Sequence, residues 1–203
     1  IPSSLGNLTN ITSIDLSMNG LTGLIPPEVG NLVDLQVLNL SRNYLEGSLP
    51  SQLSNCNKLW KFDVGYNLLN GSIPSSLRSL TELSILGLGE NGFTGGIPPF
   101  LFEFKIISNL QLGGNSLGGN IPSSIGSIGA VQNLKALNLS SNGLTGHVPT
   151  ELGKFIMLEQ LDISHNNLTG TLADLDELHS LIVVNFSYNY FTGPIPKTLM
   201  EFV

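Results

Sequence analysis

The chain has 203 residues, of which 41% are apolar and only 11% are charged, with 23 glycines, 11 prolines and one cysteine. The eight basic and fifteen acidic residues give a net charge of −7, which argues against a nucleic-acid or anionic-membrane binder because both need a Lys/Arg footprint. One cysteine excludes an internal disulfide and a cysteine-rich zinc site, and there is no apolar run of about 18 residues that would span a membrane.

An internal repeat dominates the sequence and is marked by regularly spaced asparagines. The first five stand 24 residues apart, and the later intervals are 27, 24 and 23 residues. A glycine follows each asparagine by four residues, and an apolar residue precedes it by three. Copies of Leu-x-x-Leu-x-Leu-x-x-Asn-x-Leu-x-Gly-x-Ile-Pro predict a solenoid, in which each unit buries its apolar side only by stacking on its neighbours. The asparagines are Asn19, Asn43, Asn67, Asn91, Asn115, Asn142, Asn166 and Asn189.

Within each unit the first expected element is a short strand at the Leu-x-Leu core, such as residues 38–40, with alternate side chains pointing inward. So short a strand must pair with the next copy, which predicts a parallel sheet. The asparagine is expected to turn inward and to bond backbone groups of its own turn and of the next. The glycine then permits a tight or left-handed turn, the Ile-Pro step favours extended backbone, and the chain returns through a short helical or extended turn.

This unit resembles the plant-type extracellular leucine-rich repeat, whose Leu-x-Gly-x-Ile-Pro tail distinguishes it from the cytosolic and animal types. The resemblance covers essentially all of the chain. It implies a leucine-rich repeat solenoid with 24-residue repeats: a right-handed superhelix with a concave parallel β-sheet and short helical or extended turns on the convex side. Residues 1–203 are expected to form one domain of about eight repeats. Because such ectodomains usually carry cysteine-pair caps and none stands here, the chain is expected to be a fragment of a longer receptor or a short, unusual relative.

Several stretches are similar to one group of plant receptor-like kinases, the receptors for elicitor (danger) peptides. These stretches are LEGSLPSQLSNC, KFDVGYNLLNGSIPSS, GGIPPFL and GGNIPSSIGS, in this order. The resemblance implies an extracellular ligand-recognition domain of a plasma-membrane protein, with no cofactor, that binds an extended basic peptide along its inner surface. No kinase signature occurs in the chain, so these residues are expected to bind a ligand and not to catalyse a reaction.

The variable residues between the consensus leucines are expected to lie side by side on the concave face. Acidic side chains and tyrosines give this face its character, and tyrosines are enriched at binding hot spots. Gly87, Gly89, Gly113 and Gly114 predict a bare strip where a peptide backbone can lie close. The residues expected to bind the peptide are Lys61, Asp63, Tyr66, Glu90, Gln111 and Asp162.

Two further surfaces are expected. The resemblance implies that a co-receptor kinase ectodomain of the somatic-embryogenesis type docks on the last repeats, near His165, Tyr188 and Tyr190. Acceptor motifs for N-glycosylation occur at seven asparagines and agree with a secreted protein. We expect occupancy at Asn7, Asn10 and Asn70, whereas glycans at three other motifs would block part of the concave face. The seven asparagines are Asn7, Asn10, Asn39, Asn70, Asn138, Asn167 and Asn185.

Other functions are less compatible with the pattern. Asp162, Ser164 and His165 are residue types of a catalytic triad, but their order follows the repeat consensus and offers no pocket. The three histidines fall at different phases of the repeat, so no metal site is expected. Cys56 is expected to be a buried, small apolar residue. The alternatives are a secreted polygalacturonase-inhibiting or other defence protein of the same fold, and a structural or ice-binding solenoid, which would need regular Thr or Asn rows.

Overall fold

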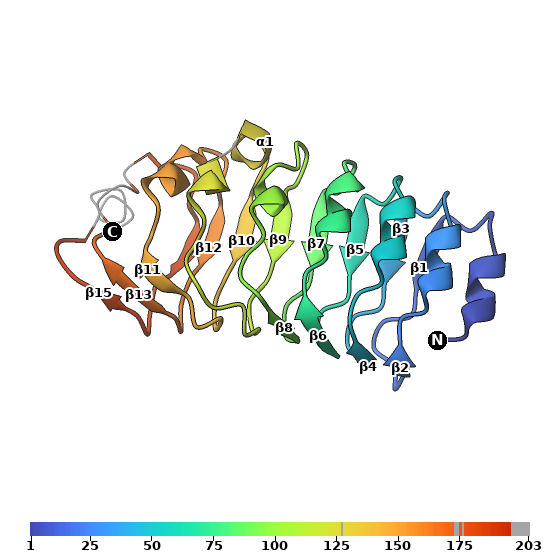
Figure 1. Ribbon diagram of the computed structural model, residues 1–203. Coiled ribbons are helices and arrows are strands. Elements are labelled where there is room, and N and C mark those ends of the chain that lie inside the picture. The colour runs from blue at the N-terminus through green and yellow to red at the C-terminus, as the bar shows by residue number, and fades with distance from the viewer. Residues whose placement is uncertain (127, 173–174, 176, 196–203) are drawn as a thin grey trace.

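The computed structural model describes residues 1–126, 128–172, 175 and 177–195. The chain winds through successive coils, one for each sequence repeat, and the coils stack side by side from the N-terminal end to the C-terminal end (Figure 1). Equivalent positions of the repeats therefore become neighbours in space although they are some 24 residues apart in sequence.

One side of the stack is a parallel sheet of eight strands, one from each coil and in chain order. The middle residue of each strand points inward, and Leu38, Phe62 and Leu86 are fully buried. This sheet confirms the predicted parallel arrangement. Its strands are β1 (Ser13–Asp15), β3 (Val37–Asn39), β5 (Lys61–Asp63), β7 (Ile85–Gly87), β9 (Asn109–Gln111), β10 (Ala136–Asn138), β12 (Gln160–Asp162) and β14 (Val183–Asn185).

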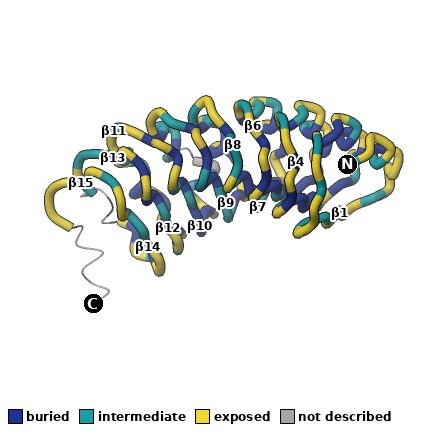
Figure 2. Tube along the Cα trace, turned by 90° about the horizontal axis from the view of Figure 1, so that it is seen from below, coloured by how far each residue is buried: buried dark blue, intermediate teal, exposed yellow. Residues whose placement is uncertain are grey.

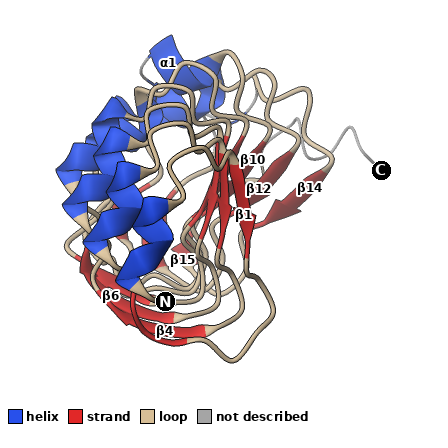
Figure 3. Ribbon diagram, turned by 90° about the vertical axis from the view of Figure 1, so that its right-hand side faces the viewer, coloured by secondary structure: helices blue, strands red, loops and turns tan. Residues whose placement is uncertain are grey.

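Short helical turns lie on the opposite side of the stack, as predicted (Figure 3). Most begin directly after the Ile-Pro step, because the extended proline at the N-cap, such as Pro74 with φ −70° and ψ 133°, leads the chain into the turn. The 3-10 turns are η1 (Ser3–Asn7), η2 (Pro27–Asn31), η3 (Ser51–Asn55), η4 (Ser75–Ser79), η5 (Pro99–Phe102), η6 (Ser123–Gly126) and η7 (Thr150–Lys154). The 27-residue repeat adds α1 (Ile128–Val131), which projects from this side (Figure 1).

A second parallel sheet runs along the edge of the stack between the first sheet and the helical turns (Figure 3), and the sequence analysis did not predict it. It is interrupted where Gly118 and Gly119 both have positive φ, at +64° and +68°. Its first part contains β2 (Thr22–Leu24), β4 (Tyr44–Gly47), β6 (Leu68–Ser72) and β8 (Gly92–Thr94), and its second part contains β11 (Thr145–His147), β13 (Asn167–Gly170) and β15 (Tyr190–Phe191).

The repeated asparagines form a ladder that holds the coils in register, and five of them, Asn43, Asn67, Asn115, Asn142 and Asn166, are buried. Asn67, 7% exposed, donates from Nδ2 to the carbonyl oxygens of Leu40 and Val64 at 3.1 and 2.9 Å, and its Oδ1 accepts the N–H of Leu45 at 2.9 Å. The hydrogen bonds that it makes outside its own turn are therefore to the preceding coil. From the sequence they were expected to be to the following coil. The bonding itself was predicted correctly, because an amide supplies donors and an acceptor together.

Apolar side chains from all three sides fill the interior of the stack, and buried and exposed residues alternate along each coil (Figure 2). Cys56 belongs to this core, as predicted: it is fully buried, its Sγ lies 3.4 Å from the carbonyl oxygen of Val29, and burial raises the pKa of its thiol to about 11. No helix of the described residues is both long and apolar enough to cross a membrane.

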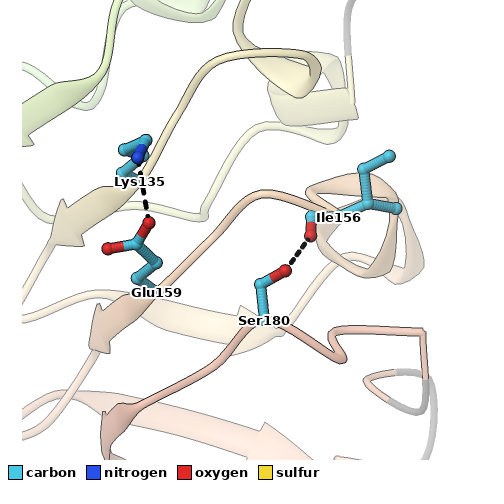
Figure 4. Close-up of polar contacts among 4 residues, drawn as sticks. All are labelled: Lys135, Ile156, Glu159 and Ser180. Carbon is cyan, nitrogen blue, oxygen red and sulfur yellow. Dashed lines mark hydrogen bonds and ion pairs between the residues drawn. The ribbon is translucent and has the colours of Figure 1, made fainter.

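Polar contacts between equivalent positions of adjacent coils add to the stacking (Figure 4). Lys135 Nζ pairs with Glu159 Oε1 at 3.0 Å, and Ser180 Oγ donates to the carbonyl oxygen of Ile156 at 2.6 Å. Such exposed pairs contribute little stability individually, about 0 to 1 kcal/mol. Stacking of the coils thus rests mainly on the core and the asparagine ladder.

Candidate functional site

The outer face of the eight-stranded sheet carries two columns of variable side chains, because the first and last residues of each strand point away from the core. The register keeps these columns straight: Val37 pairs with Lys61, and Asn39 pairs with Asp63. The same alignment continues along the sheet from β1 to β14. The predicted concave columns are therefore confirmed as neighbours in space.

A third column stands directly before the ladder asparagines, where the chain adopts a left-handed turn. This conformation is uncommon outside glycine, yet Tyr66 has φ +58° and Glu90 has φ +56°. The turn is held from both sides, because Tyr66 donates its N–H to the carbonyl oxygen of Gly89 at 2.9 Å and Asn67 is fixed in the ladder. The non-glycine members of the column are Met18, Arg42, Tyr66, Glu90, Ser141, His165 and Tyr188.

A shallow depression of about 220 Å³ lies near the middle of the sheet, between the column of last strand residues and the third column; we call it the central depression. Four of the six residues predicted to bind the peptide line it, and three other side chains and four glycines complete it. The predicted residues that line it are Asp63, Tyr66, Glu90 and Gln111. The other residues are Ser41, Arg42, Asn138, Gly65, Gly87, Gly89 and Gly113.

Glycines give the central depression its shape. A Cβ at Gly87 would come within 2.5 Å of Asp63 Oδ1, and a Cβ at Gly114 would contact the carboxylate of Glu90. Each acidic side chain therefore lies over a glycine of the following coil, in space that any larger residue would occupy. Three of the four glycines predicted to form a bare strip line the depression, and Gly65 extends the strip toward the N-terminal end.

The acidic groups of the central depression retain hydrogen-bonding capacity. Asp63 Oδ1 accepts the N–H of Gly65 at 2.9 Å, whereas its Oδ2 and the carboxylate of Glu90 have no hydrogen-bond partner among the residues that the structure describes. The ion pairs formed within that part of the chain, Lys58–Asp34, Arg78–Glu103 and Lys135–Glu159, all lie elsewhere. Free carboxylates beside bare backbone are suited to a cationic ligand group.

In the remaining coils the last residue of the strand makes different hydrogen bonds. In them an Asp or Asn of the strand accepts hydrogen bonds from the serine two residues later: Asp162 Oδ1 accepts the N–H and the hydroxyl of Ser164 at 2.9 and 2.6 Å. We call these five the outer coils, and the three with glycine in place of that serine the central coils. The outer pairs are Asp15–Ser17, Asn39–Ser41, Asn138–Ser140, Asp162–Ser164 and Asn185–Ser187. The central glycines are Gly65, Gly89 and Gly113.

Two residues predicted to bind the peptide lie outside the central depression. Asp162 lines a second, smaller hollow that also contains Gln111, and its Oδ2 lies 3.4 Å from Asn185 Nδ2. Lys61 is the first residue of β5, at the other end of the strand from Asp63. The structure thus gathers four of the six predicted residues at one place and distributes the other two along the same face.

Arg42 was not predicted as a site residue, although it lines the central depression. Its guanidinium stacks over the ring of Tyr66, with 4.4 Å from Cζ to the ring centroid. The 24-residue spacing of the two residues in one column was the signal available in the sequence, because stacked coils bring such pairs into contact. The stack fixes the Tyr66 ring and adds a cation to an otherwise acidic site.

The residues predicted to contact a co-receptor lie together near the C-terminal end. The rings of His165 and Tyr188 are stacked, with centroids 4.1 Å apart and planes at 15°. Tyr188 is 75% exposed and Tyr190, in β15, is 66% exposed. The same column spacing that joins Arg42 to Tyr66 therefore builds an exposed aromatic surface here.

The asparagines predicted to carry glycans, Asn7, Asn10 and Asn70, are all exposed. Across the described residues no group of three or more His, Cys, Asp or Glu side chains could hold a metal ion. The Asp162 and Ser164 side chains, considered as members of a triad, are bonded to one another as part of the outer-coil pattern.

Comparison with known proteins gives a consistent result. A family model described as Leucine Rich Repeat matches residues 10–32, 34–56, 133–155, 157–176 and 180–202. No curated protein gives a match. Among solved structures, the chain is similar to PEPR1 in its complex with AtPEP1, with 55% identity and a TM-score of 0.94 over 99% of this chain and 29% of that one.

Two other solved structures extend the comparison. The plant peptide hormone receptor RGFR1 in complex with RGF2 shares 37% identity with a TM-score of 0.92, over 99% of this chain and 32% of that one. The Arabidopsis receptor kinase HAESA, in complex with the peptide hormone IDA and the co-receptor SERK1, shares 34% identity with a TM-score of 0.90, over 98% of this chain and 33% of that one. The chain thus spans between 29% and 33% of the length of these three structures. Its resemblance to the ectodomains of plant receptor kinases is confirmed.

Proposed function

The chain belongs to the leucine-rich repeat family, and from this we propose that it is part of the extracellular ligand-recognition domain of a plant receptor-like kinase. It binds an extended basic peptide on its concave face and performs no catalysis. Its similarity to PEPR1, RGFR1 and HAESA, all solved in complexes, supports a role in peptide binding. One feature of this chain carries the proposal, namely the two unpaired carboxylates over bare glycine in the central depression.

The central depression favours a ligand held by its side chains. Backbone carbonyl oxygens at the glycines are already paired, for example Gly89 with the N–H of Tyr66 and Gly113 with the N–H of Glu90 at 2.7 Å. A bound peptide therefore does not add a strand to this sheet. It instead presents Lys or Arg side chains to Asp63 and Glu90, where charge-assisted bonds are strong and the low-lying glycines permit close approach.

The other proposed contacts follow the path of an extended peptide along the sheet. Tyr66, fixed by Arg42, supplies an amphipathic anchor, and Gln111 offers its side-chain oxygen in the central depression, since its Nε2 already donates to Asn109 Oδ1 at 2.6 Å. Asp162 and Lys61 contribute less in this proposal, because Asp162 is bonded to Ser164 and Lys61 would repel a basic ligand. A peptide that crosses coils 24 residues apart would bridge several repeats at once.

The C-terminal aromatic surface is proposed to receive the co-receptor, a kinase ectodomain of the somatic-embryogenesis type. His165, Tyr188 and Tyr190 offer exposed rings, which are enriched at protein interfaces. The HAESA complex with the co-receptor SERK1 supports this assignment by similarity. Ordering the peptide beside these rings creates a composite surface for the second protein.

The charge of the central depression provides the test. AtPEP1 and a synthetic Lys/Arg-rich peptide of unrelated sequence are titrated into the chain and into the double variant Asp63→Lys/Glu90→Lys by calorimetry near physiological salt. The variant is expected to bind at least about tenfold more weakly, a loss of about 1.4 kcal/mol, because two attractive contacts become repulsive.

A matched control separates local contact from overall charge. Glu46→Lys/Glu82→Lys makes the same change in net charge at exposed positions away from the central depression, and is expected to change affinity less than about threefold because salt screens distant charges. Equal losses in both variants, or no loss in the first, would contradict the proposed site. If only AtPEP1 binds, recognition depends on sequence; if both peptides bind equally, it depends on charge.

A further inference from the structure

The seven glycosylation motifs divide into two structural groups. At Asn39, Asn138 and Asn185 the side-chain oxygen accepts hydrogen bonds from the serine of the same motif, as in the Asn138–Ser140 pair at 2.7 Å. These three belong to the outer-coil pattern and face the concave side, and Asn138 lines the central depression. The second group, at residues 7, 10, 70 and 167, is exposed and lies off this face.

Asn167 is the member of the second group that the sequence analysis did not select. It begins β13, where its backbone N–H donates to the carbonyl oxygen of Leu144 at 2.7 Å, while its side-chain amide has no partner in the part of the chain described. The residue is exposed although it directly follows the buried ladder residue Asn166. The strand thus fixes the backbone and leaves the acceptor amide free.

The hydroxyl that completes the motif belongs to Thr169. It donates to the carbonyl oxygen of Gly146 at 3.2 Å, so this threonine is ordered in the second sheet. On the following coil the residue paired with Thr169 is Tyr190, which is 66% exposed. A sugar on Asn167 would therefore stand at the edge of the stack, beside the C-terminal aromatic surface and away from the central depression.

We propose that Asn167 carries an N-linked glycan in the secreted protein, and that Asn39, Asn138 and Asn185 remain unmodified. The transfer forms a bond between Asn167 Nδ2 and C1 of an N-acetylglucosamine, breaks the bond from that C1 to a lipid-pyrophosphate donor, and releases the lipid pyrophosphate with one amide proton. The glycan borders His165, Tyr188 and Tyr190 without covering the concave face. The proposal rests on the secretory route that the proposed function entails.

Site occupancy is measured directly on the chain secreted from plant cells behind a cleavable signal peptide. Glycopeptides are released by an amidase in heavy-oxygen water, which converts each occupied Asn into isotopically labelled Asp, and are read by mass spectrometry. We expect label at Asn167 and none at Asn39, Asn138 or Asn185. Because the signal peptide is supplied, this result does not depend on whether the chain binds a peptide.

Paired variants assign the modification to the motif. Thr169→Ala removes the acceptor hydroxyl and is expected to lower the intact mass by one glycan, whereas Thr169→Ser keeps the motif and the glycan. Asn167→Gln repeats the loss without removing the bond from Thr169 to Gly146. An unlabelled Asn167 beside labelled Asn70, an unchanged glycan mass in both loss variants, or label on a concave asparagine would overturn the proposal.

Discussion

The outer and central coils share the same strands and asparagine ladder, but the side chains of their concave column are hydrogen-bonded differently. In the outer coils each Asp or Asn is bonded to its own serine, and neighbours are joined as well, as in Asn39 Nδ2 to Asp15 Oδ2 at 3.0 Å. In the central coils the serines are replaced by Gly65, Gly89 and Gly113, and the column itself is interrupted by Gly87.

The difference shows how a repeat protein can leave polar side chains free on one face without changing its fold. Removing serine hydroxyls leaves the strands and the asparagine ladder intact, since these depend on other positions. Gly65 leaves Asp63 Oδ1 with a backbone N–H as its donor, whereas Gly87, in place of the Asn that bonds Oδ2 in the outer coils, leaves Asp63 Oδ2 without a side-chain partner and lowers the surface around it. Polar groups that are bonded within the protein have less capacity to bind a ligand, so the outer coils are structural and the central coils are available.

The largest expected effect tests whether the framework is common to both regions. Asn67→Leu in a central coil and Asn142→Leu in an outer coil should each lower the free energy of unfolding by about 3 to 5 kcal/mol, because backbone groups that they satisfy become buried without partners. Urea unfolding followed by circular dichroism measures both losses.

Asn70→Leu provides the control, since Asn70 is exposed and its replacement should change stability by no more than about 0.5 kcal/mol. The two ladder variants should agree with each other. If Asn67→Leu behaved like the control while Asn142→Leu did not, the central coils would not share the framework of the outer coils.

Gly65→Ser gives a central coil the serine that the outer coils carry. It is expected to change stability only slightly and to weaken peptide binding clearly. The new hydroxyl can donate to Asp63 Oδ1, but a Cβ at position 65 stands 3.3 Å from the carbonyl oxygen of Gly89, so the gain and the close contact offset each other and stability should change by no more than about 1 kcal/mol. The same hydroxyl engages Asp63 and fills part of the central depression, so affinity for a basic peptide should fall about tenfold.

The reverse exchange in an outer coil, Ser17→Gly, serves as its counterpart. It should lower stability slightly, because Asp15 loses a hydroxyl donor at 2.6 Å, and leave peptide affinity unchanged. Calorimetric titration and urea unfolding of both variants give the two readouts. A gain of affinity in Gly65→Ser, or a loss in Ser17→Gly, would remove the distinction between available and bonded columns.

The smallest effect concerns ionisation in an outer coil. The side chain and backbone N–H of Ser17, followed by Asn39, hold the pKa of Asp15 below its ordinary value. The stabilisation is therefore present above the ordinary carboxyl pKa and is lost as pH falls through the lowered value. Ser17→Ala should raise the pKa of Asp15 toward the ordinary range, which carbon NMR of the carboxyl group can follow. Ser187→Ala, in another coil, should leave the pKa of Asp15 unaltered. If Ser17→Ala gave no rise, Ser17 would not be the cause of the shift.

Much of the site could be anticipated because repeat spacing places residues on common columns. Asp63, Tyr66, Glu90 and Gln111 were predicted from that spacing and line one depression. Arg42 stands in the same column as Tyr66, but the sequence does not show that its long side chain turns onto the ring. Asp63 and Asp162 have the same place in the repeat, and the sequence separates them by Gly65 in place of Ser164 and Gly87 in place of Asn185, but only the structure shows which hydrogen bonds these replacements remove.

The sequence by itself determined the solenoid, the eight-stranded sheet and the inward asparagines, because these follow from a period that recurs through the chain. Only the tertiary structure decided where the second sheet breaks, at Gly118 and Gly119, and which carboxylates remain unpaired. The physical reason is that periodicity fixes which residues are neighbours, whereas the direction of a side chain and the partner that it meets depend on the volume and hydrogen-bonding groups of the adjacent coil.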